Sequence, residues 1–376
     1  MVSAPAVMVS GMLAGIPHQG GATWAVLQYV LGLRRLGCEV VFVEPVAAAG
    51  ALAEIPAAAY FEHVCEQFRL EGSAALIDPG SNASLGLSRD ELRDAADRTD
   101  LLLNLSGVLA DEDLLDRIPA RAFVDLDPGF TQLWAEAEGI DLGFARHNRF
   151  VTIGQAIGSP ECPVPTCGRD WITTPQPVVL EQWPFAAAVE TDALTSVGHW
   201  RAYGSIEHEG VHYGQRAHSL RELFELPTRS DASFLLALGI HPAETDDLEA
   251  LHGNGWRLAD PGEVAGTPAR YRDFVAGSWA ELGVAKSGYV AARCGWFSDR
   301  SACYLASGRP VVAQHTGFAS FVPTGDGLLA FRTADEAVEA VEDLRADYDH
   351  HRHAARTIAR DVFDSDRVLT RLLECL

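Results

Sequence analysis

The sequence predicts an α/β protein built from two Rossmann-like domains that face each other across a cleft. Three observations lead to this fold class. The chain has 376 residues, which exceeds one ordinary hydrophobic core and suits two domains. Apolar, strand-like runs alternate with amphipathic, helix-like runs in both halves, a pattern typical of parallel sheets. Between residues 158 and 190 the chain is irregular and rich in proline and cysteine, which favours a linker there.

The first half opens with the order strand, loop, helix, strand. "APAVMVSGML" predicts a buried strand, "AGIPHQGGAT" a glycine-rich loop, "WAVLQYVLGLRRLG" an amphipathic helix that ends at Gly37, and "CEVVFVEP" the next strand. A helix over "AAAYFEHVCEQFRL" and a capping box from Ser88 to Glu91 follow. Further strands are predicted over "LLLNLSG", "ARAFVDLDPG" and "RFVTIGQAIG". We expect a first domain over residues 1–185.

The second half repeats this alternation from about residue 194. Strands are predicted over "ALTSVGHW" and "ASFLLALGI", with the helix "GQRAHSLRELFELP" between them. The stretch 295–318 predicts a short helix that ends at Gly308, followed by the buried strand "RPVVAQ". A capping box from Thr333 to Glu336 starts a run of terminal helices. We expect a second domain over residues 186–376, with the last helix as a candidate to pack back on the first domain.

The composition narrows the classes of partner. The net charge of -23 argues against nucleic acid and anionic membrane, because both require a basic surface. No run of 18 apolar residues is present, so no membrane span is predicted. Seven cysteines without a CxxC pair indicate a reducing compartment, and we expect the cytoplasm. The GxGxxG, P-loop and GxSxG patterns are missing, so NAD, P-loop triphosphate and hydrolase sites are unsupported.

The stretch "GWFSDRSACYLASGRPVVAQHTGF" carries the most specific signal. Ser298 or Asp299 is expected to cap a helix whose first amide groups could receive a phosphate, and Arg300 could bind two phosphate oxygens. The order of loop, short helix, "LASGRPVVAQ" and "TGF" resembles the donor-binding half of GT-B glycosyltransferases. The alternative interpretation is a capped helix and strand without a ligand.

The resemblance implies a site for the diphosphate of a nucleotide sugar. It places Ser298, Asp299, Arg300 and Ser301 at the diphosphate and Thr316, Gly317 and Phe318 beside the donor. It also makes Gly198, Trp200 and Arg201 candidates for donor contacts and Trp256, Leu258 and Asp260 candidates for the base pocket. Lys286, next to Ser287, is expected to neutralise the leaving diphosphate in place of a metal. Gly295 and Cys303 stand where many retaining members carry glutamates, which argues against that subgroup.

The first loop supplies the candidate catalytic residues. The resemblance places His18, in the loop that also holds Gly20 and Gly21 on the acceptor side, as general base toward an acceptor hydroxyl. A neutral imidazole suits this role because its pKa lies near the working pH. Asp125 or, preferably, Asp127 would orient the imidazole. The alternatives are that His18 only closes a loop and that Asp127 only opens an Asp-Pro-Gly turn.

Together these features predict a glycosyltransferase that moves a sugar from a nucleotide diphosphate sugar to a hydroxyl of a small-molecule acceptor, as in natural-product glycosylation. We expect inversion, no metal and no cofactor. The alternatives are a GT-B-like nucleotide-sugar epimerase, which would need no acceptor, and a non-catalytic nucleotide-sugar-binding protein. The sequence leaves the sugar, the nucleotide, the acceptor and the oligomeric state open.

Overall fold

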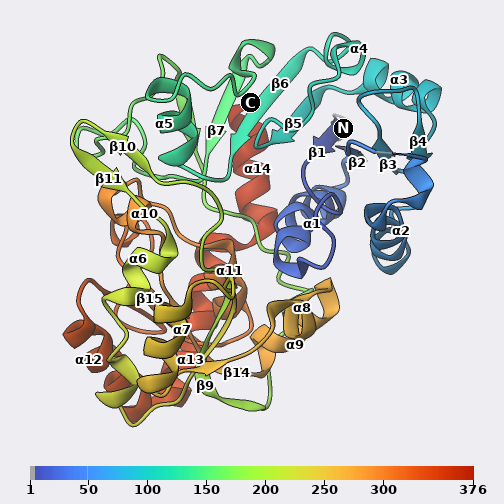
Figure 1. Ribbon diagram of the computed structural model, residues 1–376. Helices are drawn as coiled ribbons and strands as arrows, with labels where there is room; N and C mark the ends of the chain where they lie inside the picture. The colour runs from blue at the N-terminus through green and yellow to red at the C-terminus, as the bar shows by residue number, and fades with distance from the viewer. Residues whose placement is uncertain (1–4, 49) are drawn as a thin grey trace.

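The computed structural model describes residues 5–48 and 50–376 and contains two large sheets, one in each half of the chain. Figure 1 shows the first half above and the second half below, with helices around each sheet. The predicted α/β class is confirmed, since nearly all strand pairs in both sheets are parallel. The first predicted strand included Ala4, which lies outside the described residues; the observed strand begins at Ala6.

The first sheet has the order β4-β3-β2-β1-β5-β6-β7-β8, and its edge strand β4 is antiparallel to β3. Its strands are β1 (Ala6–Ser10), β2 (Glu39–Pro45), β3 (Ala74–Ile77), β4 (Ser84–Gly86), β5 (Leu101–Leu105), β6 (Ala120–Asp125), β7 (Arg149–Thr152) and β8 (Trp171–Thr173). The helices of this half are α1 (Gly20–Arg35), α2 (Pro56–Phe68), α3 (Arg89–Arg98), α4 (Glu112–Leu115) and α5 (Phe130–Glu136).

The second sheet has the order β13-β12-β9-β14-β15-β16, with all neighbours parallel. Its strands are β9 (Thr191–His199), β12 (Phe234–Gly239), β13 (Arg257–Leu258), β14 (Ser278–Gly283), β15 (Val311–Gln314) and β16 (Leu328–Phe331), and a separate hairpin pairs β10 (Ile206–His208) with β11 (Val211–Tyr213). The helices are α6 (Arg216–Arg221), α7 (Thr245–Gly253), α8 (Pro261–Ala265), α9 (Pro268–Gly277), α10 (Ser287–Ala292), α11 (Asp299–Ala306), α12 (Ala334–Ala346), α13 (Tyr348–Ile358) and α14 (Ser365–Cys375).

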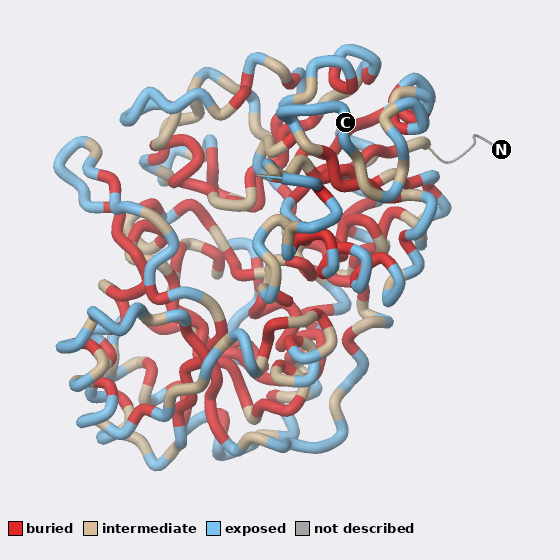
Figure 2. Tube along the Cα trace, turned by 45° about the vertical axis from the view of Figure 1, so that its right-hand side comes forward, coloured by how far each residue is buried: buried red, intermediate tan, exposed pale blue. Residues whose placement is uncertain are grey.

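Both sheets share the strand order of a doubly wound fold. Counted along the chain, the main parallel strands of each half lie in the order 3-2-1-4-5-6, so the order reverses beside β1 and beside β9. The sheets form the buried layer of each half, which Figure 2 shows as red segments inside exposed helices and loops. Ligands of such sheets bind beyond the carboxyl ends of the strands where the order reverses. The ends of β1 and β9 are therefore the places to look for a site.

The predicted caps are largely present. Ser88 and Glu91 form the reciprocal capping box of α3. At α12 the Thr333 side chain accepts the Glu336 amide, but the Glu336 carboxylate returns to the amide of Arg332 instead of Thr333. The local helix signals were thus sufficient to place the starts of both helices.

The two halves are joined by contacts as well as by the linker. In α14, which Figure 1 shows in red beside the upper sheet, Asp366 pairs with Arg35 of α1 at 3.0 Å. Gly32 of α1 allows α14 to pack this closely, since a Cβ at position 32 would lie 2.5 Å from Leu369 of α14. Across the cleft, the indole nitrogen of Trp24 donates to the carbonyl of Pro268 at 2.8 Å. Over the described residues, none of the helices combines the length and apolar character that crossing a membrane requires.

Candidate functional site

A cavity of about 360 Å³ lies between the two halves, where β1 and β9 end. It is bounded by four segments: the loop before α1, the end of β9, the α8–α9 region and the start of α11. The lining residues are Pro17, His18, Gln19, Gly20, Gly21, Ala22, Val197, Gly198, His199, Pro261, Gly262, Ala265, Tyr271, Asp299 and Arg300. The cavity thus occupies the place where doubly wound sheets bind ligands, and both halves contribute to it.

Two helix amino ends border this cavity. In the described part of the chain, neither the Gln19 side chain at the start of α1 nor the Ser298 side chain at the start of α11 accepts a capping hydrogen bond. The amide groups of a first helical turn have no partner within the helix, and this end carries a partial positive charge. The amino ends of α1 and α11, one from each half, therefore border the same cavity with amide groups and positive potential, which suits an anionic ligand.

Glycines allow the segments around this cavity to pack closely against one another. A Cβ at Gly20 would lie 2.3 Å from the carbonyl oxygen of Thr267, and one at Gly21 would lie 2.9 Å from the ring of Tyr271. The loop with Gly20 and Gly21, predicted on the acceptor side, therefore packs directly on the second half. Gly198 has a φ of 146°, and a Cβ there would lie 2.6 Å from Nη1 of Arg216. Each of these positions requires a residue without a side chain.

Arg300 is buried, and its guanidinium is held from two sides. Its Nε donates to a carboxylate oxygen of Glu281 at 2.5 Å, and its Nη1 donates to the carbonyl of Val197 at 3.1 Å. Nη2 has no hydrogen-bond partner among the described residues. Burial lowers the pKa of Arg300, but Glu281, Tyr271 and Asp299 together outweigh this effect and raise the pKa above its usual range. Arg300 is therefore a fixed cation that borders the cavity and keeps one buried donor group without a partner among the described residues.

A second buried cation, Arg216, was not predicted from the sequence. Its Nε donates to the carbonyl of Val284 and its Nη1 to that of His199, both at 3.0 Å. In residues 5–48 and 50–376, no carboxylate lies within ion-pair distance of Arg216. Burial, and next the charge of Arg300, lower the pKa of Arg216 to about 9, so it stays charged at neutral pH. A buried charge without a counter-ion is costly, and an anionic ligand would relieve that cost.

Two histidines line the cavity from opposite halves. His18 is exposed and adopts a left-handed φ of 65°, with its ring 5.7 Å from that of Tyr60. His199, at the end of β9, has its Nε2 at 3.4 Å from the side-chain oxygen of Gln19. Partial burial, followed by the charges of Arg216 and Lys286, lowers the pKa of His199. His18 was predicted at this position, whereas His199 was not.

Asp127 does not orient His18, which corrects the expectation for this pair. The Asp127 carboxylate instead accepts hydrogen bonds from Tyr203 at 2.5 Å, from Lys286 at 3.1 Å, and from Tyr289. Lys286 also lies over the rings of Tyr203, at 4.0 Å, and Phe130, at 5.1 Å. The Asp127 carboxylate is thus already occupied by an ammonium and two phenols, and its pair with Lys286 joins the two halves.

Lys286 was predicted to neutralise a diphosphate, and the structure instead pairs it with Asp127. It does not line the cavity. Burial lowers its pKa, although the Asp127 carboxylate opposes that shift. Lys286 would have to leave Asp127 before it could reach a phosphate.

The structure also corrects the expectation for two tryptophans. Trp200 and Trp256 are buried in the core of the second half, with 1% and 3% of their surface exposed. The indole nitrogen of Trp200 donates to Asp247 at 3.0 Å, and that of Trp256 donates to the carbonyl of Phe224 at 2.9 Å. Neither indole faces the cavity, because apolar packing and a satisfied N–H group hold each one inside.

The loop after β15 was predicted beside the donor, but it does not line the cavity. Thr316 is buried and donates to the carbonyl of Trp296, and Phe318 packs on Phe297 with ring centroids 5.1 Å apart. At Gly317, whose φ is 97°, a Cβ would lie 2.8 Å from the carbonyl of Arg293. This loop therefore supports the segment before α11 and reaches the cavity only through it.

Of the four residues predicted at the diphosphate, two line the cavity and two do not. Asp299 and Arg300 border it, whereas Ser298 and Ser301 face a narrow void behind α11. Among the other candidates, Arg201 forms an ion pair with Glu244. Asp260 caps α8, beside the lining residues Pro261 and Gly262.

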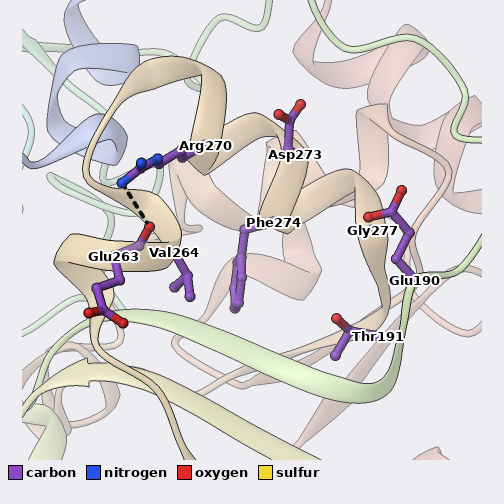
Figure 3. A pocket seen from close by; sticks show the side chains of 8 residues that line it. All are labelled: Glu190, Thr191, Glu263, Val264, Arg270, Asp273, Phe274 and Gly277. Atoms are coloured by element: carbon purple, nitrogen blue, oxygen red, sulfur yellow. Dashed lines mark hydrogen bonds between the residues drawn. The ribbon is translucent and has the colours of Figure 1, made fainter.

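A larger cavity of about 600 Å³ lies on the far side of the α8–α9 region. Figure 3 shows its carboxylates, Glu190, Glu263 and Asp273, spaced around the opening. Its one arginine, Arg270, donates to the backbone carbonyl of Glu263 at 3.3 Å. Three acidic side chains would repel a phosphate, so this cavity does not suit the anionic ligand that the inter-domain cavity suits.

Comparisons with known proteins identify the fold. No protein-family model and no curated protein match the chain. Among solved structures, an alpha-glucosyltransferase in complex with UDP-glucose and DNA is 12% identical, with 98% of each chain covered and a TM-score of 0.63. HepE from Anabaena, in complex with UDP and glucose, is 12% identical over 99% of this chain and 100% of its own, with a TM-score of 0.59.

Sucrose-phosphate synthase from Thermosynechococcus elongatus is 13% identical over 99% of this chain and 98% of its own, with a TM-score of 0.58. The chain has the GT-B fold. The resemblance inferred from residues 295–318 is thus confirmed at the level of the fold. A GT-B chain brings two doubly wound halves face to face, and the 360 Å³ cavity lies between them.

Proposed function

We propose that this protein transfers a sugar from a nucleotide diphosphate sugar, with UDP as the nucleotide, to a hydroxyl group of a small-molecule acceptor. One observation carries the proposal. In a chain with a net charge of -23, the buried Arg300 and two helix amino ends border one inter-domain cavity, and the buried Arg216 lies directly behind its lining residues Gly198 and His199. Although Glu281 pairs with Arg300, Arg216 has no such partner among the described residues, and this local positive potential in an acidic protein favours an anionic ligand.

The diphosphate would lie between the start of α1 and Arg300. The amide groups of Gly20 and Gly21 would approach it from one side, and the guanidinium of Arg300 from the other. Asp299 also lines the cavity, and its carboxylate would repel a phosphate, so we assign it to hydroxyl groups of the ligand. The nucleobase would lie against Pro261, Gly262 and Tyr271. Two of the similar structures contain UDP, which favours uridine.

His18 would act as the general base. As the acceptor oxygen forms its bond to the anomeric carbon, the bond from that carbon to the diphosphate oxygen breaks, and the hydroxyl proton passes to the His18 imidazole. Attack from the face opposite the leaving group inverts the anomeric centre. The leaving diphosphate would be stabilised by Arg300, Arg216 and the helix amides, so we propose that no metal and no further cofactor take part.

The acceptor would be a small molecule. One similar protein was solved with DNA, but a net charge of -23 gives this chain no general attraction for a polyanion. The cavity volume of about 360 Å³ is in the range of small-ligand sites. The seven cysteines are free thiols, in line with the proposed cytoplasmic location.

Calorimetry with UDP, UMP and uridine tests the proposal. If the diphosphate is the anchor, affinity should fall by about 10-fold or more for each phosphate removed, since each charge-assisted contact contributes about 1.5–3 kcal/mol. Equal affinity for UDP and uridine, or no binding of either, would contradict the site. Product analysis with a UDP-sugar then separates the activities. Turnover without acceptor would indicate an epimerase, and tight binding without turnover would indicate a binding protein.

A further inference from the structure

The wall of the cavity next to His18 is an irregular loop, residues 11–19, which joins β1 to α1. Three consecutive amides of this loop donate to one carboxylate, that of Glu44 at the end of β2. The distances are 3.1 Å from Leu13, 2.8 Å from Ala14 and 2.7 Å from Gly15. The carboxylate thereby fixes the backbone immediately before the cavity-lining residues 17–22.

Glu44 is fully buried, and its carboxylate has no ion-pair partner within the described residues. Only backbone amides compensate its charge, which makes it an expensive group to bury. Gly15 is fitted to it, because a Cβ at that position would lie 2.8 Å from the carboxylate oxygen. The buried Glu44 carboxylate and Gly15, which leaves space for it, together stabilise the conformation of this loop.

A second contact restrains the same loop from α1. The Thr23 hydroxyl donates to the carbonyl of Leu13 at 2.9 Å and lies 2.9 Å from the hydroxyl of Tyr60. At the end of the loop His18 adopts a left-handed φ of 65°, which is unfavourable for a residue with a side chain. Anchors at residues 13–15 and at Thr23 therefore hold a strained residue at the cavity.

We propose that Glu44 is a positioning residue of the donor site. Through the amides of residues 13–15 its ionised carboxylate fixes the β1–α1 loop, so that the amino end of α1 and His18 meet the ligand without prior ordering. This inference rests on the proposed function, because the ligand it concerns is the nucleotide diphosphate. Pre-ordering of this kind strengthens binding by removing the entropic cost of fixing the loop.

The charge state of Glu44 gives the proposal a specific signature. Burial raises the pKa of Glu44 to about 7, although its three amide bonds oppose the shift. Leu13, Ala14 and Gly15, which donate to it, and Leu76, its partner on β3, carry no charge, and no charged group contributes to the shift. Protonation places a hydrogen on one carboxylate oxygen and removes the negative charge, so the group accepts more weakly from the loop amides. Affinity for UDP should therefore weaken as the pH falls from 8 to 6.

The test is calorimetric titration of UDP into the full chain and into E44Q and E44A at pH 8 and pH 6. At pH 8 we expect UDP affinity to fall about 5-fold in E44Q, which keeps one acceptor oxygen, and further in E44A. The ratio of the parent and E44Q affinities should shrink toward one at pH 6. All groups other than residue 44 are the same in both proteins, so this ratio removes their contribution to the pH dependence.

D247N serves as the matched control. Asp247 is also a buried carboxylate, but it binds Arg221 and Trp200 away from the cavity. This variant should lose stability and keep the parent UDP affinity within about twofold. If E44Q fails to fold, UDP binding to the double variant H18N/H199N at pH 8 and pH 6 decides, because a pH-independent affinity there would overturn the proposal.

Different results would exclude the proposed function and the role of Glu44. If the parent does not bind UDP, the proposed function is wrong. If the parent binds UDP and folded E44Q binds it equally well at pH 8, the proposed function stands and the role of Glu44 is refuted.

Discussion

Replacing Arg300 with methionine tests the electrostatic core of the site. Methionine keeps much of the side-chain volume but removes the charge, and it leaves Glu281 with no partner for its carboxylate. Glu281 is 0% exposed, and one of its oxygens already lacks a hydrogen-bond partner among the described residues. Breaking a buried ion pair by removing one partner typically costs about 3–5 kcal/mol. We expect R300M to lose that much of its free energy of unfolding.

The double variant R300M/E281Q separates stability from binding. Glutamine removes the stranded charge, so the double variant should recover at least half of the lost stability. UDP affinity should stay low in both variants, by about 10–150-fold, which corresponds to the 1.5–3 kcal/mol of a charge-assisted hydrogen bond. A simple loss of folding would instead restore affinity together with stability.

Urea unfolding and calorimetry with UDP, both at pH 8, measure the two quantities. If the free energy of unfolding of R300M lies within about 1 kcal/mol of the parent value, the Arg300–Glu281 ion pair does not stabilise the fold as expected. If the folded double variant binds UDP as tightly as the parent does, Arg300 does not bind the diphosphate.

Three further predictions follow from individual contacts. H18A should lower turnover by about 10²–10⁴-fold and leave UDP affinity nearly unchanged, and unaltered turnover in a steady-state assay would exclude His18 as the base. G198A should lose about 1–3 kcal/mol of stability and bind UDP more weakly, because the new Cβ meets Arg216 at 2.6 Å and φ is 146°. Glu44 has its pKa raised to about 7 in the folded chain, so the folded state binds the extra proton at acid pH. The stability of the parent relative to E44Q should therefore decrease by about 2–3 kcal/mol between pH 5 and pH 8, and a constant difference in urea unfolding would contradict the shift.

Much of the fold was predictable because its signals are local. The alternation of strands and helices, the cap at Ser88 and the helix end at Gly308 depend on residues close in the sequence. The stretch 295–318 likewise identified the GT-B fold, since its helix and strand form as expected. His18, Gly198 and Arg300, which were singled out from the sequence, line the same cavity.

The partners of these residues could not be predicted, because they come from distant segments. Nothing near Arg300 in the sequence indicates Glu281, which is 19 positions away on β14. Asp127 and Lys286 are separated by 159 positions, and only the packing of the two halves brings them together. An acid at the end of an apolar strand, as in "FVEP", was a usable signal for Glu44, since a buried strand rarely ends in an unpaired carboxylate.

The electrostatics of the site follow from where its charges are fixed. Surface charges in an acidic chain are screened by salt, whereas Arg216 and Arg300 are buried and held by backbone carbonyls of Val284, His199 and Val197. Their positions therefore change little when a ligand binds, so a diphosphate would meet donors that need no reorganisation. Lys286 differs, because its counter-ion Asp127 belongs to the opposite half. If the halves move apart, that pair must break while the two arginines stay in place, so the arginines define the anion site and Lys286 responds to the closure of the cleft.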